Sequence, residues 1–203
     1  MKRKILEISI SAALILSIVF SVAGFQNGCD ELRNDVLRLH ILANSDSKED
    51  QQIKLAVRDA LLTCGKKMFS GETNVNNAED ILISEKEELI EAANKVLEQN
   101  GFGYKAQITL AEEYFTTRTY DEYTLPAGNY RALKVILGEG EGHNWWCVMF
   151  PPLCLPAAVE NTDTDLYFDE NGGKIIQSNP KYEIRFKLIE IIEEIKIKIF
   201  NNK

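Results

Sequence analysis

The hydrophobic pattern changes its period at Asn100-Gly101, and this change constrains the fold more than any other feature of the sequence. Before this point, apolar residues recur every three or four positions from Ser47 to about Met68 and from about Ala78 to Gln99. This spacing predicts two amphipathic helices. Beyond it, from about Tyr104 to Leu137, apolar and polar residues alternate, as in strands with one buried face. Helices and strands in separate blocks are typical of the α+β class.

We therefore predict an α+β domain with a mostly antiparallel sheet of about four to five strands, two helices in the N-terminal half and one C-terminal helix. The predicted strands are residues 37–41, 104–110, 114–120, 130–137 and 145–150, and the C-terminal helix is 182–200. We expect strand 114–120 to pair with 104–110. Strand 145–150 is apolar on both faces, which predicts a central position in the sheet. Residues 171–173, Asn-Gly-Gly, predict a loop.

The N-terminus has the pattern of an export signal. Three basic residues at positions 2–4 precede an uncharged apolar run from Ile8 to Phe25, and Ser21-Val22-Ala23 offers small residues for a signal peptidase. We predict a signal peptide over residues 1–23, with a single exported domain over residues 24–203. The alternative is an uncleaved membrane anchor, because a run of about 18 residues is near the lower limit for spanning a bilayer.

The charge balance limits the classes of partner. The chain carries a formal net charge of −8 at pH 7, and its Lys and Arg residues form no obvious patch in the sequence. This composition argues against binding to nucleic acid and against adsorption on anionic lipid. We therefore expect membrane contact only through the N-terminal segment, and only if that segment stays attached.

The cysteine pattern fits an oxidising compartment, because an exported chain with four cysteines suggests disulfides. We expect a disulfide between Cys147 and Cys154, which flank Pro151-Pro152. An extended chain would hold these cysteines roughly 23 Å apart, whereas a disulfide needs Cα atoms about 4.4–6.8 Å apart, so the prolines must lie in a reversal. The pairing of Cys29 with Cys64 is left open. The alternative is four buried thiols, since free cysteine packs as a small apolar residue.

Scarce residue types gather in the segment from Gly138 to Cys154, which holds both tryptophans and one of the two histidines. The glycine loop 138–142 joins two predicted strands and is typical of a hairpin connection, although it can also cradle a ligand or admit a partner's backbone. We predict that His143 and Asn144 are exposed partner-binding residues. Trp145 and Trp146 point to opposite faces of their strand, so one belongs to the core and the other is a candidate interface anchor.

The turn 44–47, Asn-Ser-Asp-Ser, is a second candidate for partner binding through Asn44 and Asp46. The alternative is a strand-to-helix turn whose side chains cap the following helix, with Ser47 and Asp50 at capping-box spacing.

Catalytic and metal sites are less well supported by the sequence. His143 and Cys147 lie four residues apart, which is roughly 13 Å along a strand, so a Cys-His enzyme would need His40 to approach Cys147 instead. The two histidines are far apart, and no HxxH or CxxC spacing is present. We therefore expect no catalytic residue, no metal and no cofactor.

Two segments and the C-terminal helix resemble one protein family. LHILANSDSKEDQ at residues 39–51, continued by KLAVRD at 54–59, resembles the N-terminal signature of stage II sporulation protein R of endospore-forming Firmicutes. LPAGNYRALKVILGEGEGHNWWCVMFPPLC at 125–154 resembles its second signature, and YEIRFKLIEII at 182–192 is similar to its C-terminal helix.

The resemblance implies a signalling role rather than catalysis. Members of the family are made in the forespore under its early sigma factor and are exported toward the space between the two septal membranes. There they trigger a membrane-embedded aspartic protease of the mother cell, which removes the pro-sequence of the mother-cell sigma factor. The alternative is a peptidoglycan-binding or hydrolysing module that applies His143, Trp145 or Trp146 to sugar. A glycan hydrolase needs paired carboxylates beside a cleft, and no such pair stands out.

The export pattern yields a first prediction. Because small residues at Ser21-Val22-Ala23 follow the apolar run, we expect the mature chain to begin near Gly24. N-terminal sequencing of the protein recovered from sporulating cells measures this directly. A recovered chain that still begins at Met1 contradicts cleavage and supports the anchor.

Overall fold

A computed structural model shows an α+β protein and describes residues 2–120, 123–153, 167–168, 170–177 and 183–200. The chain divides into two compact units. The sheet unit comprises residues 34–114 and 129–168, and the leader unit comprises residues 1–33, 115–128 and 169–203. The α+β class predicted from the change of period is confirmed. That residues 24–203 form a single exported domain stays a prediction.

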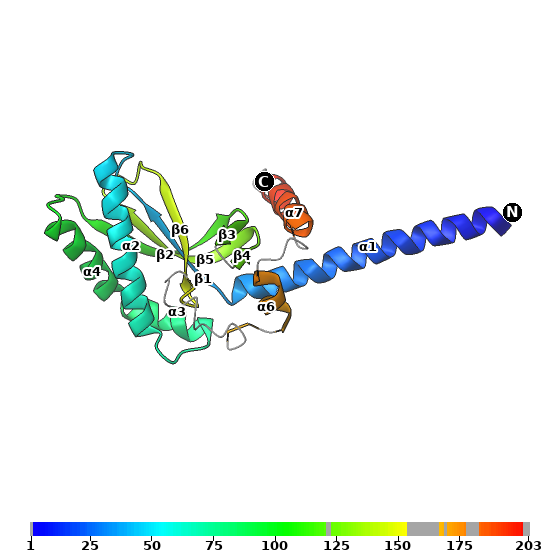
Figure 1. The fold of residues 1–203 in the computed structure, drawn as a ribbon, viewed down its shortest axis with the longest axis horizontal. Helices are drawn as coiled ribbons and strands as arrows, with labels where there is room; N and C mark the ends of the chain where they lie inside the picture. Colours follow the sequence, from blue (N-terminus) through cyan, green and yellow to red (C-terminus); the bar gives the residue numbers. More distant parts are fainter. Residues whose placement is uncertain (1, 121–122, 154–166, 169, 178–182, 201–203) are drawn as a thin grey trace. The chain divides into compact units, whose positions relative to one another are not determined.

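A four-stranded mixed sheet forms the centre of the sheet unit, with the strand order β2-β5-β1-β6 (Figure 1). The strands are β1 Leu37–Leu42, β2 Ala106–Phe115, β5 Gly128–Leu137 and β6 Asn144–Phe150. β1 pairs with β5 in parallel and with β6 in antiparallel orientation. The parallel pair places the ends of β1 and β5 at the same edge of the sheet, which determines the location of the candidate site.

The order of the strands corrects two expectations. β5 and β6 are consecutive in sequence but β1 lies between them, so the glycine loop 138–142 is not a hairpin turn. β6 is at the end of the strand order rather than in the middle. The apolar pattern misled because it reports what covers the two faces of a strand, whereas the position in the sheet depends on pairing along its edges.

Three helices of the sheet unit are α2 Lys48–Met68, α3 Val75–Ser84 and α4 Lys86–Gln99. Ser47 caps α2 by accepting a hydrogen bond from the Asp50 backbone at 3.1 Å, as its spacing predicts. The segment expected as one helix over 78–99 is two helices that meet at Glu85. The Ser84 hydroxyl donates to the Ile81 carbonyl at 2.8 Å, a local bond that competes with the helical pattern where α3 ends.

The core of the sheet unit lies between the sheet and the helices. On β1, Leu37, Leu39 and Ile41 are fully buried, in agreement with the predicted alternation. They belong to one apolar cluster with residues of α2, α3 and α4, among them Val57, Leu61, Leu82, Leu89 and Leu97. The helical stripes and the alternating strand residues therefore meet in one core, as the sequence pattern requires.

The leader unit holds α1 Lys2–Asn34, β3 Arg118–Tyr120, β4 Tyr123–Leu125, α6 Glu170–Ile176 and α7 Glu183–Phe200. β3 pairs with β4 in a separate two-stranded sheet, so residues 114–120 are not the antiparallel partner of 104–110 that the alternation predicted. Residues 171–173, expected as a loop, belong to α6. Short-range alternation and glycine content do not specify which segment packs against which. The pairing of β3 with β4 and the helical structure of residues 171–173 could therefore not be read from them.

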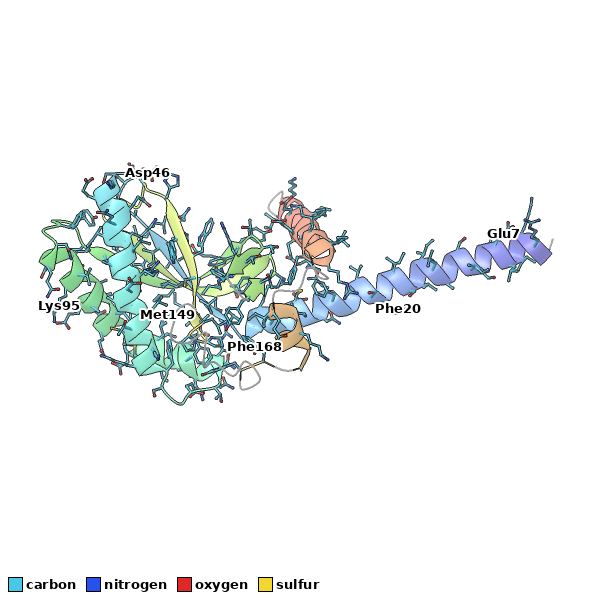
Figure 2. All side chains as sticks on the ribbon, in the orientation of Figure 1. Glu7, Phe20, Asp46, Lys95, Met149 and Phe168 are labelled. Carbon is cyan, nitrogen blue, oxygen red and sulfur yellow. The ribbon has the colours of Figure 1, made fainter. Side chains whose placement is uncertain are left out.

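α1 consists of two stretches with different surroundings. Its large apolar residues are exposed as far as Phe20, which Figure 2 shows projecting away from the helix, whereas Phe25, Cys29 and Leu32 are buried. Residues 3–34 have the length and hydropathy to cross a membrane, although a signal sequence near an N-terminus passes the same test. The change from exposed to buried falls close to the predicted cleavage point after Ala23. Cleavage and anchoring both stay predictions.

Two neighbouring residues of α3 test the assignment of the core. Leu82 is 1% exposed and Ile83 is 58% exposed. We expect Leu82→Ala to lower the free energy of unfolding by about 2–5 kcal/mol, because it leaves a cavity. Ile83→Ala is the matched control and should change it by about 0.5 kcal/mol or less. Urea unfolding measures both, and equal losses would contradict the packing of α3.

Candidate functional site

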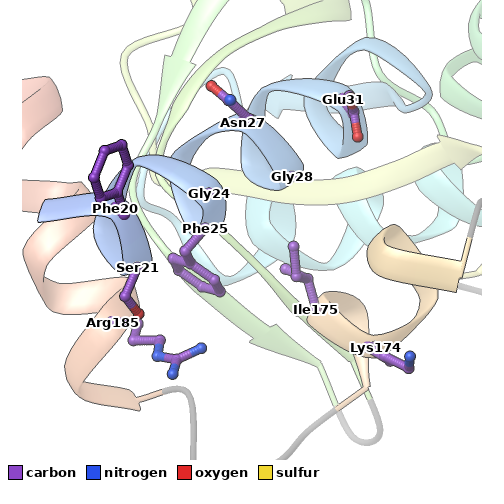
Figure 3. A pocket seen from close by; sticks show the side chains of 10 residues that line it. All are labelled: Phe20, Ser21, Gly24, Phe25, Asn27, Gly28, Glu31, Lys174, Ile175 and Arg185. Atoms are coloured by element: carbon purple, nitrogen blue, oxygen red, sulfur yellow. The ribbon is translucent and has the colours of Figure 1, made fainter. Parts of the chain in front are cut away.

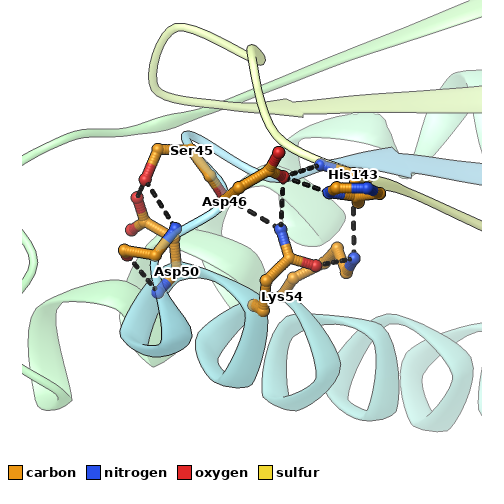
Figure 4. A network of polar contacts seen from close by, with 7 residues as sticks. Ser45, Asp46, Asp50, Lys54 and His143 are labelled. Atoms are coloured by element: carbon orange, nitrogen blue, oxygen red, sulfur yellow. Dashed lines mark hydrogen bonds and ion pairs between the residues drawn. The ribbon is translucent and has the colours of Figure 1, made fainter.

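The two segments that carry the family resemblance meet at one edge of the sheet. The turn 44–47 follows β1, and the loop 138–143 follows β5. Because β1 and β5 are adjacent and parallel, their C-terminal ends lie side by side and bring turn and loop together (Figure 4). We call residues 44–47 and 138–144 the polar edge. It contains four of the predicted partner-binding residues, Asn44, Asp46, His143 and Asn144.

Backbone contact between turn and loop explains the glycines. The Gly142 amide donates to the Ala43 carbonyl at 2.9 Å, and the Glu141 amide donates to the Asn44 carbonyl at 3.2 Å. A Cβ atom on Gly142 would lie 2.2 Å from the Ser45 carbonyl oxygen, which no side chain can tolerate. The sequence left a hairpin, a ligand cradle and a partner contact open for this loop. The structure shows a fourth use, close packing against the turn of the same chain.

Gly138 allows a side-chain bond at the same junction. Its φ is +58°, and a Cβ atom there would lie 2.1 Å from the Asn44 side-chain oxygen. That oxygen accepts a hydrogen bond from the Glu139 amide at 3.0 Å. Asn44 therefore joins turn to loop with its side chain and its backbone, so the capping alternative and the proposed recognition role do not exclude each other.

Beneath the turn, the buried carboxylate of Asp50 accepts three side-chain hydrogen bonds. The donors are the hydroxyl of Ser45 at 2.6 Å, the amide of Asn44 at 2.9 Å and the phenol of Tyr104 at 2.5 Å. Burial by itself raises the pKa of Asp50, but these hydrogen bonds outweigh it and hold that pKa below its usual value. Burial and the bond to Asp50 raise the pKa of the Tyr104 phenol, so Tyr104 stays a donor.

At the surface, the side chains of Asp46 and His143 face each other. Their exposed fractions are 55% and 77%. Asp46 accepts a hydrogen bond from the His143 backbone at 2.7 Å and pairs with the imidazole through Nδ1. The side-chain and backbone hydrogen bonds from His143 lower the pKa of Asp46, which keeps the carboxylate charged. The turn and the loop thus present one continuous polar surface rather than two alternatives.

Lys54 of α2 holds the loop from below. Its side chain is only 3% exposed, and its ammonium donates to the Gln51 side chain at 2.6 Å and to the His143 carbonyl at 2.9 Å. Burial lowers the pKa of Lys54, against the attraction of Asp46. Asp50 and Lys54 lie one helical turn apart, on the side of α2 that also carries the buried Val57 and Leu61. That spacing was the signal that sequence reasoning missed.

Asn144 is linked to a second polar group on the sheet. Its side-chain oxygen lies 2.8 Å from Nε2 of His40, whose Nδ1 lies 2.6 Å from Glu113. Glu113 also accepts a hydrogen bond from Lys134 at 2.6 Å. Burial by itself raises the pKa of Glu113, but the hydrogen bonds from Lys134 and His40 outweigh burial, so that the pKa lies below its usual value. Asn144 is exposed yet held in place by this chain of contacts.

The tryptophans lie on opposite faces of β6, as predicted. Trp145 is opposite Ile41 and packs at the edge of the apolar core, with the Arg58 guanidinium 4.6 Å from its ring centre. Trp146 is opposite His40, and their ring centres are 5.8 Å apart. Both tryptophans are half-buried. Because both are half-buried, the structure does not divide them into one core residue and one exposed anchor.

Cys147 is a structural residue. It is opposite Leu39 on β1, so it points to the face that His40 does not share. Cys147 is disulfide-bonded, whereas Cys29 and Cys64 are free. Cys154, its predicted partner, lies outside the described residues, so the pairing stays a prediction. The strand register therefore keeps His40 and Cys147 on opposite faces of the sheet, and the disulfide occupies the Cys147 sulfur. Both observations argue against the Cys-His arrangement that the sequence left open.

No group of three or more His, Cys, Asp or Glu side chains in the described ranges is arranged to hold a metal ion. The polar edge presents exposed hydrogen-bonding groups on a backbone that hydrogen bonds from Asn44 and Lys54 hold in place.

Comparisons with known proteins confirm the resemblance. A family model described as stage II sporulation protein R matches residues 33–160, which include both segments of the polar edge. Stage II sporulation protein R of Bacillus subtilis (strain 168) is 31% identical over 166 residues, covering 81% of this chain and 69% of that protein. No solved structure matches.

The buried carboxylate yields a pH-dependent prediction. We expect Asp50→Asn to lower the free energy of unfolding by about 2 kcal/mol at about pH 7, because the variant loses charge-assisted bonds and turns an amide toward buried donors. The native pKa of Asp50 lies below the unfolded value of about 3.9. The stabilisation is therefore present above about pH 4 and is lost as the pH falls through the native pKa.

Urea unfolding at several pH values should accordingly show the two proteins converging as the pH falls below about 4. Glu49→Gln, one residue away and exposed, is the matched control and should cost about 0.5 kcal/mol or less. A deficit for Asp50→Asn that is independent of pH would contradict a charged Asp50 in the native state.

Proposed function

The chain belongs to the stage II sporulation protein R family and so has a role in sporulation; from this premise we propose that it is an exported signal that activates a membrane-embedded aspartic protease. In this proposal it is made in the forespore and acts in the space between the forespore and mother-cell membranes. The protease is the one that processes the pro-form of the mother-cell sigma factor. The protein itself carries out no catalysis.

One observation carries the assignment of the contact surface to the polar edge. The family's two signature segments, far apart in sequence, converge there and leave Asp46, His143 and Asn144 exposed. Because the backbone of the polar edge is already held in place, binding does not have to order the loop, which favours a specific contact. An exposed side-chain contact such as that of Asp46 with His143 adds little to folding stability, so its value lies in what it presents to a partner.

The geometry favours this role over binding to peptidoglycan. A sugar-binding surface needs an aromatic platform, but Trp145 and Trp146 lie on opposite faces of β6 and each is packed against another side chain. Release of soluble fragments from peptidoglycan incubated with the purified protein would reverse this preference.

The proposal predicts that the polar edge is required for activation and not for folding. We expect His143→Ala and Asn144→Ala to raise the dose needed for processing of the pro-sigma factor by about tenfold or more, as for residues at the centre of an interface. His143→Ala should change the free energy of unfolding by about 0.5 kcal/mol or less, because its side chain is 77% exposed. Immunoblots of the pro-form and the mature sigma factor in sporulating cells measure processing.

Two further variants sharpen this experiment. Asp46→Asn keeps an acceptor for the His143 backbone but removes the charge, so it separates electrostatic contact from loop geometry. Lys95→Ala is the control, because Lys95 is exposed on α4 and projects from the helix in Figure 2. Wild-type dose dependence for all polar-edge variants, at equal protein levels, would show that the polar edge is only scaffold.

A further inference from the structure

α7 carries a long apolar stripe that is exposed. Ile184, Leu188, Ile191, Ile195 and Ile199 follow one another at helical spacing, and their exposed fractions run from 41% to 78%. A continuous row of large apolar side chains along an entire helix is more than the scattered apolar residues of an ordinary surface.

The opposite side of α7 is the side that packs in the leader unit. Phe186 and Ile189 are buried, and the Phe186 ring makes an edge contact with Phe25 of α1 at 5.5 Å between centres. Glu193, also buried, accepts a hydrogen bond from Gln26 at 3.0 Å and forms an ion pair with Arg33 at 3.6 Å. α7 therefore attaches to α1 with one face and turns its second apolar face outward.

Four cations border the exposed stripe. At 3.6 residues per turn, Lys187 and Lys198 lie along one side of the stripe, and Arg185 and Lys196 lie along the other. All four are exposed. Long basic side chains beside an apolar stripe are suited to a lipid surface, because their stems cover apolar groups while their charged ends reach the phosphates. Lys187 and Lys196 also form ion pairs with Glu190 and Glu193, which lie farther from the stripe. The net negative charge of the chain argues against anionic lipid, but the charged positions nearest the stripe are cations.

α7 meets α1 where the exposed apolar run of α1 ends. Arg185 and Leu188 share a small pocket with Ser21 and Phe25. Beside it is a cavity of about 370 Å³ that combines the rings of Phe20 and Phe25 with the basic side chains of Lys174 and Arg185 (Figure 3). This mixture of apolar and basic groups matches the boundary between acyl chains and headgroups.

From these contacts we propose that, in the chain that keeps its N-terminal segment, α7 is an interfacial helix whose exposed stripe lies in the headgroup region of the anionic bilayer that α1 enters. The stripe enters the acyl boundary, and the bordering cations pair with lipid phosphates. The docking surface belongs to α7 and not to the polar edge, so it is separate from the proposed contact with the protease.

The position of two adjacent residues relative to the lipid tests this inference. Ile195→Cys and Glu194→Cys are prepared in the full chain with Cys64→Ser, because Cys64 is half-exposed whereas Cys29 is fully buried. Each is labelled with the fluorophore NBD and reconstituted into phosphatidylglycerol–phosphatidylethanolamine vesicles. We expect the label at position 195 to shift to the blue and to be quenched by nitroxides on the acyl chains. The label at position 194, on the polar side, should be quenched by aqueous iodide.

The charges are tested in the same system. Lys187→Gln with Lys198→Gln should lower the ratio of docked to undocked α7, by up to about fivefold for each cation removed. Lys86→Gln with Lys95→Gln on α4 should leave it unchanged. Vesicles of phosphatidylcholine alone should mimic the Lys187 and Lys198 variant.

Three results would overturn the inference. Iodide quenching at both positions places α7 in water. A blue shift at position 195 that grows with the protein-to-lipid ratio, without nitroxide quenching, assigns the stripe to a second copy of the chain. A full chain that fails to float with vesicles excludes a lipid surface altogether. Each result leaves the polar edge and its proposed role unaffected.

Discussion

The buried carboxylate of Asp50 joins the parts of the sheet unit on which the polar edge depends. It accepts from Asn44 and Ser45 in the turn, and from Tyr104 in the segment that leads into β2. Asn44 in turn binds the loop after β5. A buried charge costs several kcal/mol unless hydrogen bonds satisfy it, so these donors are held in place as firmly as the carboxylate itself. The backbone that carries the exposed residues of the polar edge is therefore held in place as well.

The features predictable from the sequence were those governed by local periodicity. The alternation of Leu37, Leu39 and Ile41 and the cap at Ser47 are properties of short segments, and the structure has both. Pairing between strands is not local. Nothing in the sequence indicates that β1 lies between β5 and β6, because that order depends on which strands reach each other after the helices pack. For the same reason, the glycine loop was wrongly expected to be a hairpin turn.

The candidate site was predictable in composition but not in architecture. The clustering of glycines with His143 and Trp145 marked the loop, and the polar run marked the turn. Only the parallel pairing of β1 with β5 shows that turn and loop are one surface. The burial of Lys54 was not predicted from the sequence, because a charged residue on a helix is usually exposed to solvent. Its long stem and its bonds to neutral acceptors make the burial tolerable.

The two units divide two physical tasks between them. In the sheet unit, polar groups are satisfied from below and the surface presents directional hydrogen-bonding groups, which favour specificity for one partner. In the leader unit, α1 and α7 expose apolar rows that lack directional chemistry and therefore suit a fluid lipid environment. Under the proposed function the chain gains from both, because holding it at a bilayer would raise its effective concentration at a membrane-embedded partner without any new contact. Specificity then has to come only from the polar edge, whose few exposed residues rest on a fixed backbone.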